Sequence, residues 1–273
     1  NTEGRLTKEN FTGIKGLDPS KIKVVQATEN QPVVSAETFL NAIETYVKNT
    51  PEFVAIIDST SNMVPQDELD GEVRSGVRAQ LPRLLSMFFK RISNDVARTK
   101  AILIFITHNI ANTGGSRWSP AKMSDAGNML QYQAGTNMVI THRGKWEESD
   151  EQGNDVGQVA NWIVKTSAAG GKPNTNAVSY IRYGTGIDEV RELCEIANEL
   201  TFIKQTGAWY TIISALGSED KRILKLLKKH EVAEDAEAKE KFFKFQGMAR
   251  LSKFIEDNKE IQDFLYDEIK SVL

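Results

Sequence analysis

Residues 53–59 are Phe53-Val54-Ala55-Ile56-Ile57-Asp58-Ser59, an apolar run that ends on an acidic and a hydroxyl side chain. A second apolar run, Ala101–Ile106, ends on Thr107-His108-Asn109. Short runs of this kind predict buried strands, and residues 77–96 between them repeat apolar side chains at three- and four-residue steps, which predicts an amphipathic helix. This order predicts an open α/β sheet whose polar strand ends meet at one edge, where such sheets build their sites.

The position of Asp58 suits a magnesium site. A strand that ends in a carboxylate carries it to the sheet edge, where it can hold Mg²⁺ beside a nucleotide phosphate, as a Walker B strand does. Buried strands that end in aspartate are also common in other α/β proteins, so both interpretations stay open on these residues alone. No G-x-x-x-x-G-K-[ST] phosphate loop occurs, and Gly171-Lys172 is followed by Pro173 rather than by Ser or Thr.

The composition is that of an ordinary soluble globular chain: 273 residues, 40% hydrophobic and 26% charged, with a net charge of -3. Any contact with nucleic acid must therefore come from a local patch. The single cysteine, Cys194, excludes an intramolecular disulfide and fits a reducing compartment, and its apolar neighbours predict a buried structural thiol. The three histidines lack zinc-site spacing, and no apolar run reaches the roughly 18 residues of a membrane span.

The remaining elements follow from the same patterns. Ser35 is a plausible N-cap for a helix over residues 36–48. From Ser218 onward Lys and Glu alternate with apolar residues at helical spacing, so we expect a small helical unit whose nearly balanced charges are solvated rather than a DNA-binding arm. The other expected elements are strands over 22–27, 137–141, 158–165 and 177–183, and a helix over 188–200.

Two loops differ in what they indicate. Residues 64–76 are acidic and, on their own, predict a solvated loop. Residues 109–127 form a long glycine-containing stretch, and a loop of this length in a compact domain is usually functional or disordered. Arg117 and Trp118 offer a cation for phosphate and a stacking face for bases, which suits single-stranded nucleic acid. From the residues alone, a surface loop with one packed tryptophan is the simpler interpretation.

Two later motifs carry a family resemblance: Tyr183-Gly184-Thr185-Gly186-Ile187-Asp188, and Gly207-Ala208-Trp209-Tyr210. With the order of strand, acidic loop, helix, strand and long loop, they resemble the ATPase core of the bacterial and phage RecA-type recombinases, from just after the P-loop onward. The resemblance covers nearly the whole chain. It implies an α/β fold with a RecA-like P-loop ATPase core over residues 1–216, whose mostly parallel central sheet is flanked by helices, and a small C-terminal helical domain over 217–273.

The resemblance assigns roles at the nucleotide. Thr2-Glu3 is similar to the strand end where the family keeps its catalytic glutamate, so Glu3 is expected to polarise the attacking water. Asp58 and Ser59 are similar to the end of the Walker B strand, with Asp58 as the Mg²⁺ ligand. His108 stands where bacterial RecA has a glutamine that senses the γ-phosphate, and phage members can carry histidine there. Without the resemblance, Glu3 would be a frayed terminal residue and His108 a satisfied histidine at a strand end.

Further nucleotide contacts are implied at two positions. Lys165 matches the first of two lysines that reach a neighbour's nucleotide across a filament interface, and Tyr183 resembles the tyrosine that lies against adenine. Ser167 replaces the second lysine, and Gln131 stands in place of another interface lysine, so these contacts between protomers are expected to be weaker than in bacterial RecA. From its sequence position alone, Tyr183 also fits a tyrosine that caps a sheet edge.

The resemblance also implies two DNA-binding loops, residues 67–76 and 109–128. Trp118 is expected to stack or wedge, and Arg117 to contact phosphate. The residues expected to bind DNA are Asp67, Gly71, Arg74, Gly114, Gly115, Arg117, Trp118, Lys122, Gly127 and Asn128.

The implied function is a cytoplasmic DNA-dependent ATPase of recombination and repair, with ATP and Mg²⁺ as cofactors. The implied assembly is a homo-oligomeric filament on single-stranded DNA that pairs with double-stranded DNA and works with single-strand-binding and loader proteins, with no membrane. Because the Walker A motif is missing, this chain alone is expected neither to hydrolyse ATP nor to form filaments. Two alternatives stay open: a hexameric replicative helicase on the same core, and a non-catalytic DNA-binding paralogue without a P-loop.

Overall fold

The computed structural model describes residues 1–6, 11, 14, 16–30, 33–71, 80–111, 122–124, 128–146 and 152–272. These residues form two compact units. The first takes in most residues up to Asn137, together with Lys165–Pro173, and the second takes in Met138–Val164 and the chain from Asn174 onward. No helix of the described ranges is long and apolar enough to cross a membrane.

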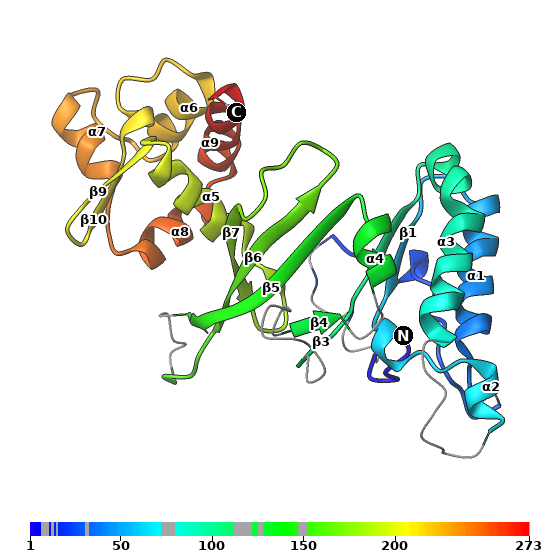
Figure 1. Cartoon of the computed structure of the whole chain (residues 1–273). Helices are drawn as coiled ribbons and strands as arrows, with labels where there is room; N and C mark the ends of the chain where they lie inside the picture. Colours follow the sequence, from blue (N-terminus) through cyan, green and yellow to red (C-terminus); the bar gives the residue numbers. More distant parts are fainter. Residues whose placement is uncertain are drawn as a thin grey trace. The chain divides into compact units, whose positions relative to one another are not determined.

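The elements are labelled along the chain in Figure 1. The helices are α1 (Ala36–Asn49), α2 (Gln66–Leu69), α3 (Gln80–Thr99), α4 (Asn128–Gln133), α5 (Glu189–Glu199), α6 (Lys221–Lys229), α7 (Ala236–Phe242), α8 (Met248–Asp257) and α9 (Lys259–Val272). The strands are β1 (Val54–Ile57), β2 (Ile102–Phe105), β3 (Asn109–Ala111), β4 (Lys122–Ser124), β5 (Thr136–Lys145), β6 (Gly157–Ser167), β7 (Asn176–Arg182), β8 (Gly186–Ile187), β9 (Ile203–Thr206), β10 (Trp209–Ile212) and β11 (Lys244–Gln246).

The first unit is built on the two strands that the sequence predicts. β1 and β2 pair in parallel, with Val54 opposite Ile102 and Ile57 opposite Phe105. Helices α1 and α3 lie side by side along them (Figure 1) and share one core with the strands. The expected α/β class is therefore confirmed, and the parallel central sheet has two strands in the described structure.

Helix α1 begins where its cap predicts. The Ser35 hydroxyl accepts a hydrogen bond from the backbone N–H of Thr38, and Phe39, Leu40 and Val47 of the helix are buried. These apolar residues fall on one face at helical spacing, which explains why the helix packs on this side of the sheet.

Helix α3 closes the same core. Leu85, Phe88 and Ile92 are buried at three- and four-residue steps, as the periodicity predicts. Pro82 is the third described residue of the helix. The Phe89 ring meets the ring of Phe105 edge-on, with centroids 5.1 Å apart. Residues 77–79, where the sequence predicts the start of this helix, lie outside the described ranges.

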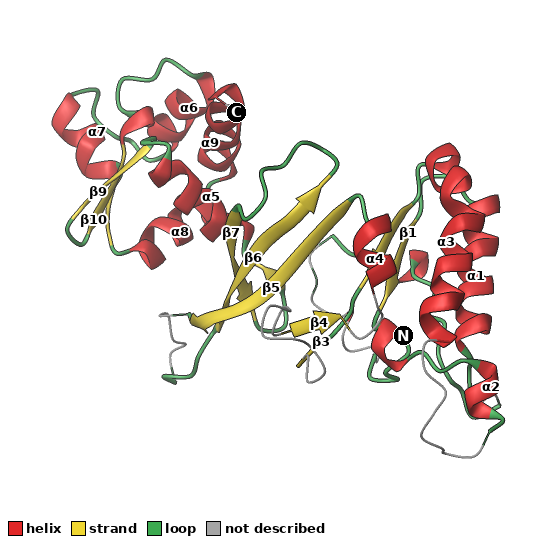
Figure 2. Ribbon diagram, viewed as in Figure 1, coloured by secondary structure: helices red, strands yellow, loops and turns green. Residues whose placement is uncertain are grey.

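The second unit contains the greater part of a four-stranded sheet in the order β5-β6-β7-β8. Its C-terminal part is a helical layer around the antiparallel sheet β11-β10-β9, which Figure 2 shows in yellow among red helices. Residues of α5, β9 and β10 share one core with residues of α6, α8 and α9. Side chains from both sides of the proposed boundary at 216 therefore pack together.

The one cysteine is structural, as its neighbours predict. Cys194 on α5 is free and fully buried, and its sulfur lies 3.7 Å from the Ser252 hydroxyl. Burial raises the pKa of the Cys194 thiol to about 12.

Three expectations differ from the structure. The stretch 109–127 is not loop throughout, because β3 and β4 pair antiparallel at its two ends. Residues 22–27 form no strand: Val24 and Val25 are exposed, and the carbonyl of Val25 accepts a hydrogen bond from the Asn1 nitrogen at 2.9 Å. A β-branched run without a partner strand makes no ladder. The acidic stretch from residue 64 is not loop throughout, because one turn of helix, α2, carries exposed Asp67.

Candidate nucleotide site

The C-terminal ends of β1 and β2 are joined by hydroxyl side chains. The backbone N–H and the hydroxyl of Thr60 both donate to the carbonyl of Ile106, at 2.9 and 3.1 Å. The Ser61 hydroxyl accepts from the backbone N–H of His108 at 3.0 Å. These contacts fix His108 beside the end of β1, which is where the sequence predicts that the two polar strand ends meet.

The first residues of the chain lie against the same edge. The backbone N–H of Thr2 donates to the carbonyl of Asp58 at 2.9 Å. The Thr2 hydroxyl donates to the carbonyl of Ser59 at 2.6 Å and accepts from the Ser59 N–H at 2.9 Å. This double contact holds Glu3, the next residue, at the end of β1.

Glu3 is the centre of the cluster. Its Oε1 accepts a 3.1 Å hydrogen bond from the hydroxyl of Ser59 and lies 3.5 Å from Nε2 of His108. Its Oε2 lies 3.4 Å from a guanidinium nitrogen of Arg5. The Glu3 side chain is 12% exposed and that of His108 is 56% exposed, so the carboxylate is sheltered while the imidazole faces solvent. A carboxylate held in this way can accept a proton from a water molecule. The exposed imidazole beside it can sense an anion.

Asp58 is suited to hold a divalent cation. Its side chain is exposed at the sheet edge, makes no hydrogen bond or ion pair with any described residue, and interacts electrostatically with the amino group of Asn1. Mg²⁺ takes one or two carboxylates and fills its other positions with water and phosphate oxygens, so one exposed aspartate fits that ion. The described residues contain no cluster of three or more acidic, histidine or cysteine side chains that could hold a metal without such oxygens.

The structure thus brings together Glu3, Asp58, Ser59 and His108 in the first unit. Lys165 on β6 is exposed, and its side chain makes no hydrogen bond or ion pair within the described part of the chain. Tyr183 follows β7 in the second unit and is 59% exposed. Both side chains are accessible to a ligand, and their nucleotide roles stay predictions.

The expected DNA-binding residues are described only in part. Asp67 is exposed on α2, and Gly71 follows that helix. Lys122 begins β4 and Asn128 begins α4. Arg74, Gly114, Gly115, Arg117, Trp118 and Gly127 lie outside the described residues.

Three hydroxyl residues were given no role by the sequence. Thr2, Thr60 and Ser61 hold the two strand ends and Glu3 together. The sequence gives only a weak signal for them. Thr60 and Ser61 closely follow a strand that ends in aspartate, and Thr2 precedes Glu3, the candidate base.

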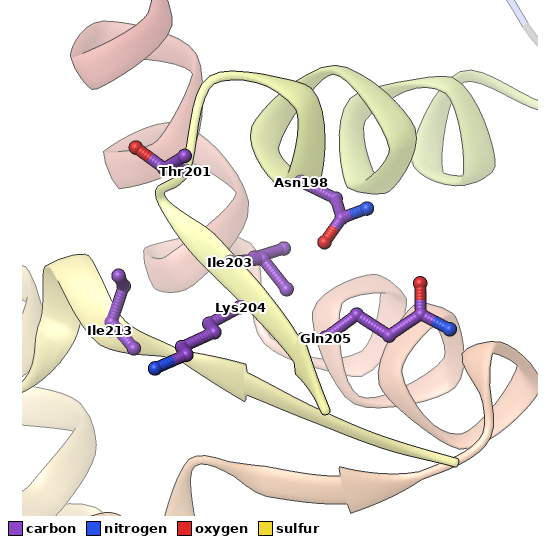
Figure 3. Close-up of a pocket in the computed structure, with 6 residues that line it drawn as sticks. All are labelled: Asn198, Thr201, Ile203, Lys204, Gln205 and Ile213. Atoms are coloured by element: carbon purple, nitrogen blue, oxygen red, sulfur yellow. The ribbon is translucent and has the colours of Figure 1, made fainter. Parts of the chain in front are cut away.

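A pocket of about 380 Å³ lies elsewhere, in the second unit (Figure 3). No residue predicted to bind nucleotide or DNA lines it. Its lining residues are Asn198, Thr201, Ile203, Lys204, Gln205 and Ile213.

The chain is similar in sequence to proteins of one known family. The RecA N-terminal domain family matches residues 15–188. Protein RecA of Chlorobaculum tepidum is 27% identical over 198 residues, which cover 72% of this chain and 56% of that relative. Protein RecA of Rickettsia canadensis is 25% identical over 250 residues, which cover 89% of this chain and 71% of that relative. The chain thus spans little more than half the length of the first relative.

Proposed function

Since the chain belongs to the RecA N-terminal domain family, we propose that it forms the core of a recombinase, a DNA-dependent ATPase that assembles on single-stranded DNA and pairs it with a homologous duplex. The observation that carries the proposal is the cluster of Glu3, Ser59 and His108 at the ends of two parallel strands. Transfer of a phosphoryl group to water depends mainly on positioning and electrostatics, and a held carboxylate at this edge supplies the base.

Each residue of the cluster has a role in the proposal. Glu3 accepts the proton of the attacking water, and the Ser59 hydroxyl fixes the carboxylate oxygen next to it. His108 senses the γ-phosphate, and its position 3.5 Å from Glu3 couples that sensing to hydrolysis. Asp58 holds Mg²⁺, which when bound neutralises negative charge on the phosphates.

Contacts outside the cluster complete the proposed cycle. Lys165 of one protomer reaches the nucleotide of a neighbour, and Tyr183 packs against adenine. The nucleotide orders the two DNA loops, and its hydrolysis releases the strand, which is switching by order and disorder of a segment. The same proposal includes assembly into a helical filament and a cytoplasmic setting. It also includes single-strand-binding and loader proteins as partners.

Glu3→Gln in the intact protein tests the proposal. We expect DNA-stimulated ATP hydrolysis to fall by roughly 10²- to 10⁴-fold while ATP binding persists, because the amide cannot accept the proton. Glu52→Gln is the matched control: Glu52 is 72% exposed, pairs with Lys100 at 3.7 Å and precedes β1 at its other end. Equal activity in Glu3→Gln and the wild type would overturn the assignment of the base.

The intact protein also distinguishes the two alternative functions, a replicative helicase and a non-catalytic DNA-binding relative. Closed rings on single-stranded DNA in electron micrographs, in place of filaments, would favour a replicative helicase. An intact protein that binds DNA without binding or hydrolysing ATP would instead be a non-catalytic DNA-binding relative.

A further inference from the structure

The carboxylate of Asp188 joins the end of β7 to the start of α5. Its Oδ2 accepts hydrogen bonds from Nε and Nη2 of Arg182 at 3.1 and 2.9 Å, and its Oδ1 accepts from the backbone N–H of Arg191 at 2.9 Å. The backbone N–H of Asp188 donates to the carbonyl of Tyr180 at 2.8 Å. One side chain therefore caps a helix and anchors Arg182, the residue next to Tyr183.

Aromatic rings hold Arg182 as well. Its guanidinium lies 4.5 Å from the ring centroid of Trp146, which is 3% exposed. The Trp146 and Tyr180 rings have centroids 5.4 Å apart, and the guanidinium of Arg191 lies 4.5 Å from the Tyr180 ring. The stacking on Trp146 and the ion pair with Asp188 therefore hold the guanidinium of Arg182 from two directions.

Tyr183 projects from this framework into solvent. Its backbone N–H donates to the carbonyl of Val156 at 3.0 Å, and the N–H of Thr185 donates to the carbonyl of Arg182 at 3.3 Å. Gly184 and Gly186 have φ angles of +79° and +95°, which glycine adopts without strain. The backbone of the turn is thus fixed at both ends, while the Tyr183 ring is 59% exposed.

We propose that Asp188 is a positioning residue that, through Arg182, holds Tyr183 where it packs against the base of a nucleotide. The inference rests on the nucleotide role proposed above for Tyr183. A ring that is held in place before binding loses less conformational freedom when the base arrives. Asparagine at position 188 keeps the helix cap and loses the charged contact with Arg182, so the two roles of Asp188 can be separated.

The test compares two ligands and four forms of the intact protein: wild type, Tyr183→Ala, Asp188→Asn and the double variant. The ligands are ATP and inorganic tripolyphosphate, which has no base. We expect Tyr183→Ala to weaken ATP binding by about tenfold and Asp188→Asn by about threefold to tenfold. The double variant should bind ATP no more weakly than Tyr183→Ala, because both changes remove one interaction. Tripolyphosphate affinity should stay unchanged throughout.

Asp220 provides a matched control. It caps α6 by accepting from the N–H of Arg222 at 2.7 Å and pairs with the Arg222 guanidinium at 2.9 Å, so Asp220→Asn makes the same chemical change at another helix. A second variant, Arg182→Lys, leaves the α5 cap intact, and it should weaken ATP binding as Asp188→Asn does. Thermal unfolding of each variant checks that the unit folds.

The outcomes separate the two proposals. If Tyr183→Ala binds ATP as the wild type does, the nucleotide role of Tyr183 is wrong. If Tyr183→Ala weakens binding while Asp188→Asn and Arg182→Lys behave like Asp220→Asn, the base contact stands and the positioning role of Asp188 is overturned. The positioning role of Asp188 would also be overturned if the two losses of ATP affinity added in the double variant, or if tripolyphosphate affinity fell as much as ATP affinity.

Discussion

The hydroxyl of Ser59 donates a 3.1 Å hydrogen bond to Oε1 of Glu3, although 56 positions separate the two residues in the sequence. Ser59 is fully buried, so water does not compete for this bond. The contact orients the carboxylate that we propose as the base, and the second carboxylate oxygen, Oε2, faces Arg5.

Ser59→Ala in the intact protein is expected to lower the rate of ATP hydrolysis by about tenfold, because an unheld carboxylate spends less time in the productive orientation. ATP affinity should stay unchanged. Steady-state kinetics at saturating ATP measures the effect. Ser20→Ala is the control, since the Ser20 hydroxyl makes a similar bond to Asp18 at an exposed turn. An unchanged turnover in Ser59→Ala would show that Glu3 needs no such support.

Trp118→Ala is expected to weaken binding of single-stranded DNA by about tenfold, because stacking of a base on an aromatic ring is lost. Fluorescence anisotropy with a labelled oligothymidylate measures it at fixed salt concentration. Trp209→Ala provides the comparison, since Trp209 on β10 is 43% exposed and is not assigned to DNA. Wild-type affinity in Trp118→Ala would remove this residue from the DNA site.

Glu44 stabilises the first unit above acidic pH. It is buried, and its pKa is lowered mainly by the hydrogen bond from Lys48 on α1, with Arg91 of α3 contributing at 2.9 Å. A lowered folded-state pKa means that this stability is fully present above the unfolded-state pKa of about 4.3 and is lost as pH falls through the folded-state value. Glu44→Gln should therefore lower the free energy of unfolding at pH 7 by about 1–3 kcal/mol and flatten its decline below about pH 5.

Urea denaturation between pH 7 and pH 3 measures this dependence. Glu52→Gln is the control, because Glu52 is exposed and its ion pair with Lys100 is long. Parallel pH profiles for Glu44→Gln and the wild type would contradict the assignment.

Gly157→Ala is expected to destabilise the second unit by about 3 kcal/mol or more, because overpacking here meets backbone. An added Cβ would lie 2.2 Å from the carbonyl oxygen of Ile181 and 2.8 Å from Cε3 of Trp146. Gly135→Ala should be nearly neutral, since a Cβ there meets no atom of the described residues within 4 Å. Thermal unfolding compares the two variants, and equal melting temperatures would show that β6 and β7 can separate without cost.

The local parts of the fold were predictable from sequence. Helix α1 with its Ser35 cap, helix α3 and the strands β1 and β2 are each encoded by apolar periodicity within a short window. The run from Ile22 to Ala27 has the composition of a strand, but strand formation needs a partner strand, which a local pattern does not specify.

The site was predictable as a set of residue types and not as a set of contacts. Asp58 and His108 follow from parallel strands whose ends meet at one edge. The position of Glu3 depends on hydrogen bonds of Thr2 and Ser59, and their separation of 57 positions lies beyond any periodicity argument. For the same reason, the sequence does not predict that the guanidinium of Arg182 stacks on the ring of Trp146.

The buried thiol of Cys194 has a practical consequence. Labelling reagents react with the thiolate, and a thiol whose pKa is about 12 supplies very little of it at neutral pH. Because these 273 residues contain no other cysteine, this chain already serves as an unreactive background. A cysteine introduced at an exposed position, such as that of Lys165, would carry a fluorescent or spin label by itself, so distances and motions can be measured without first removing a native residue.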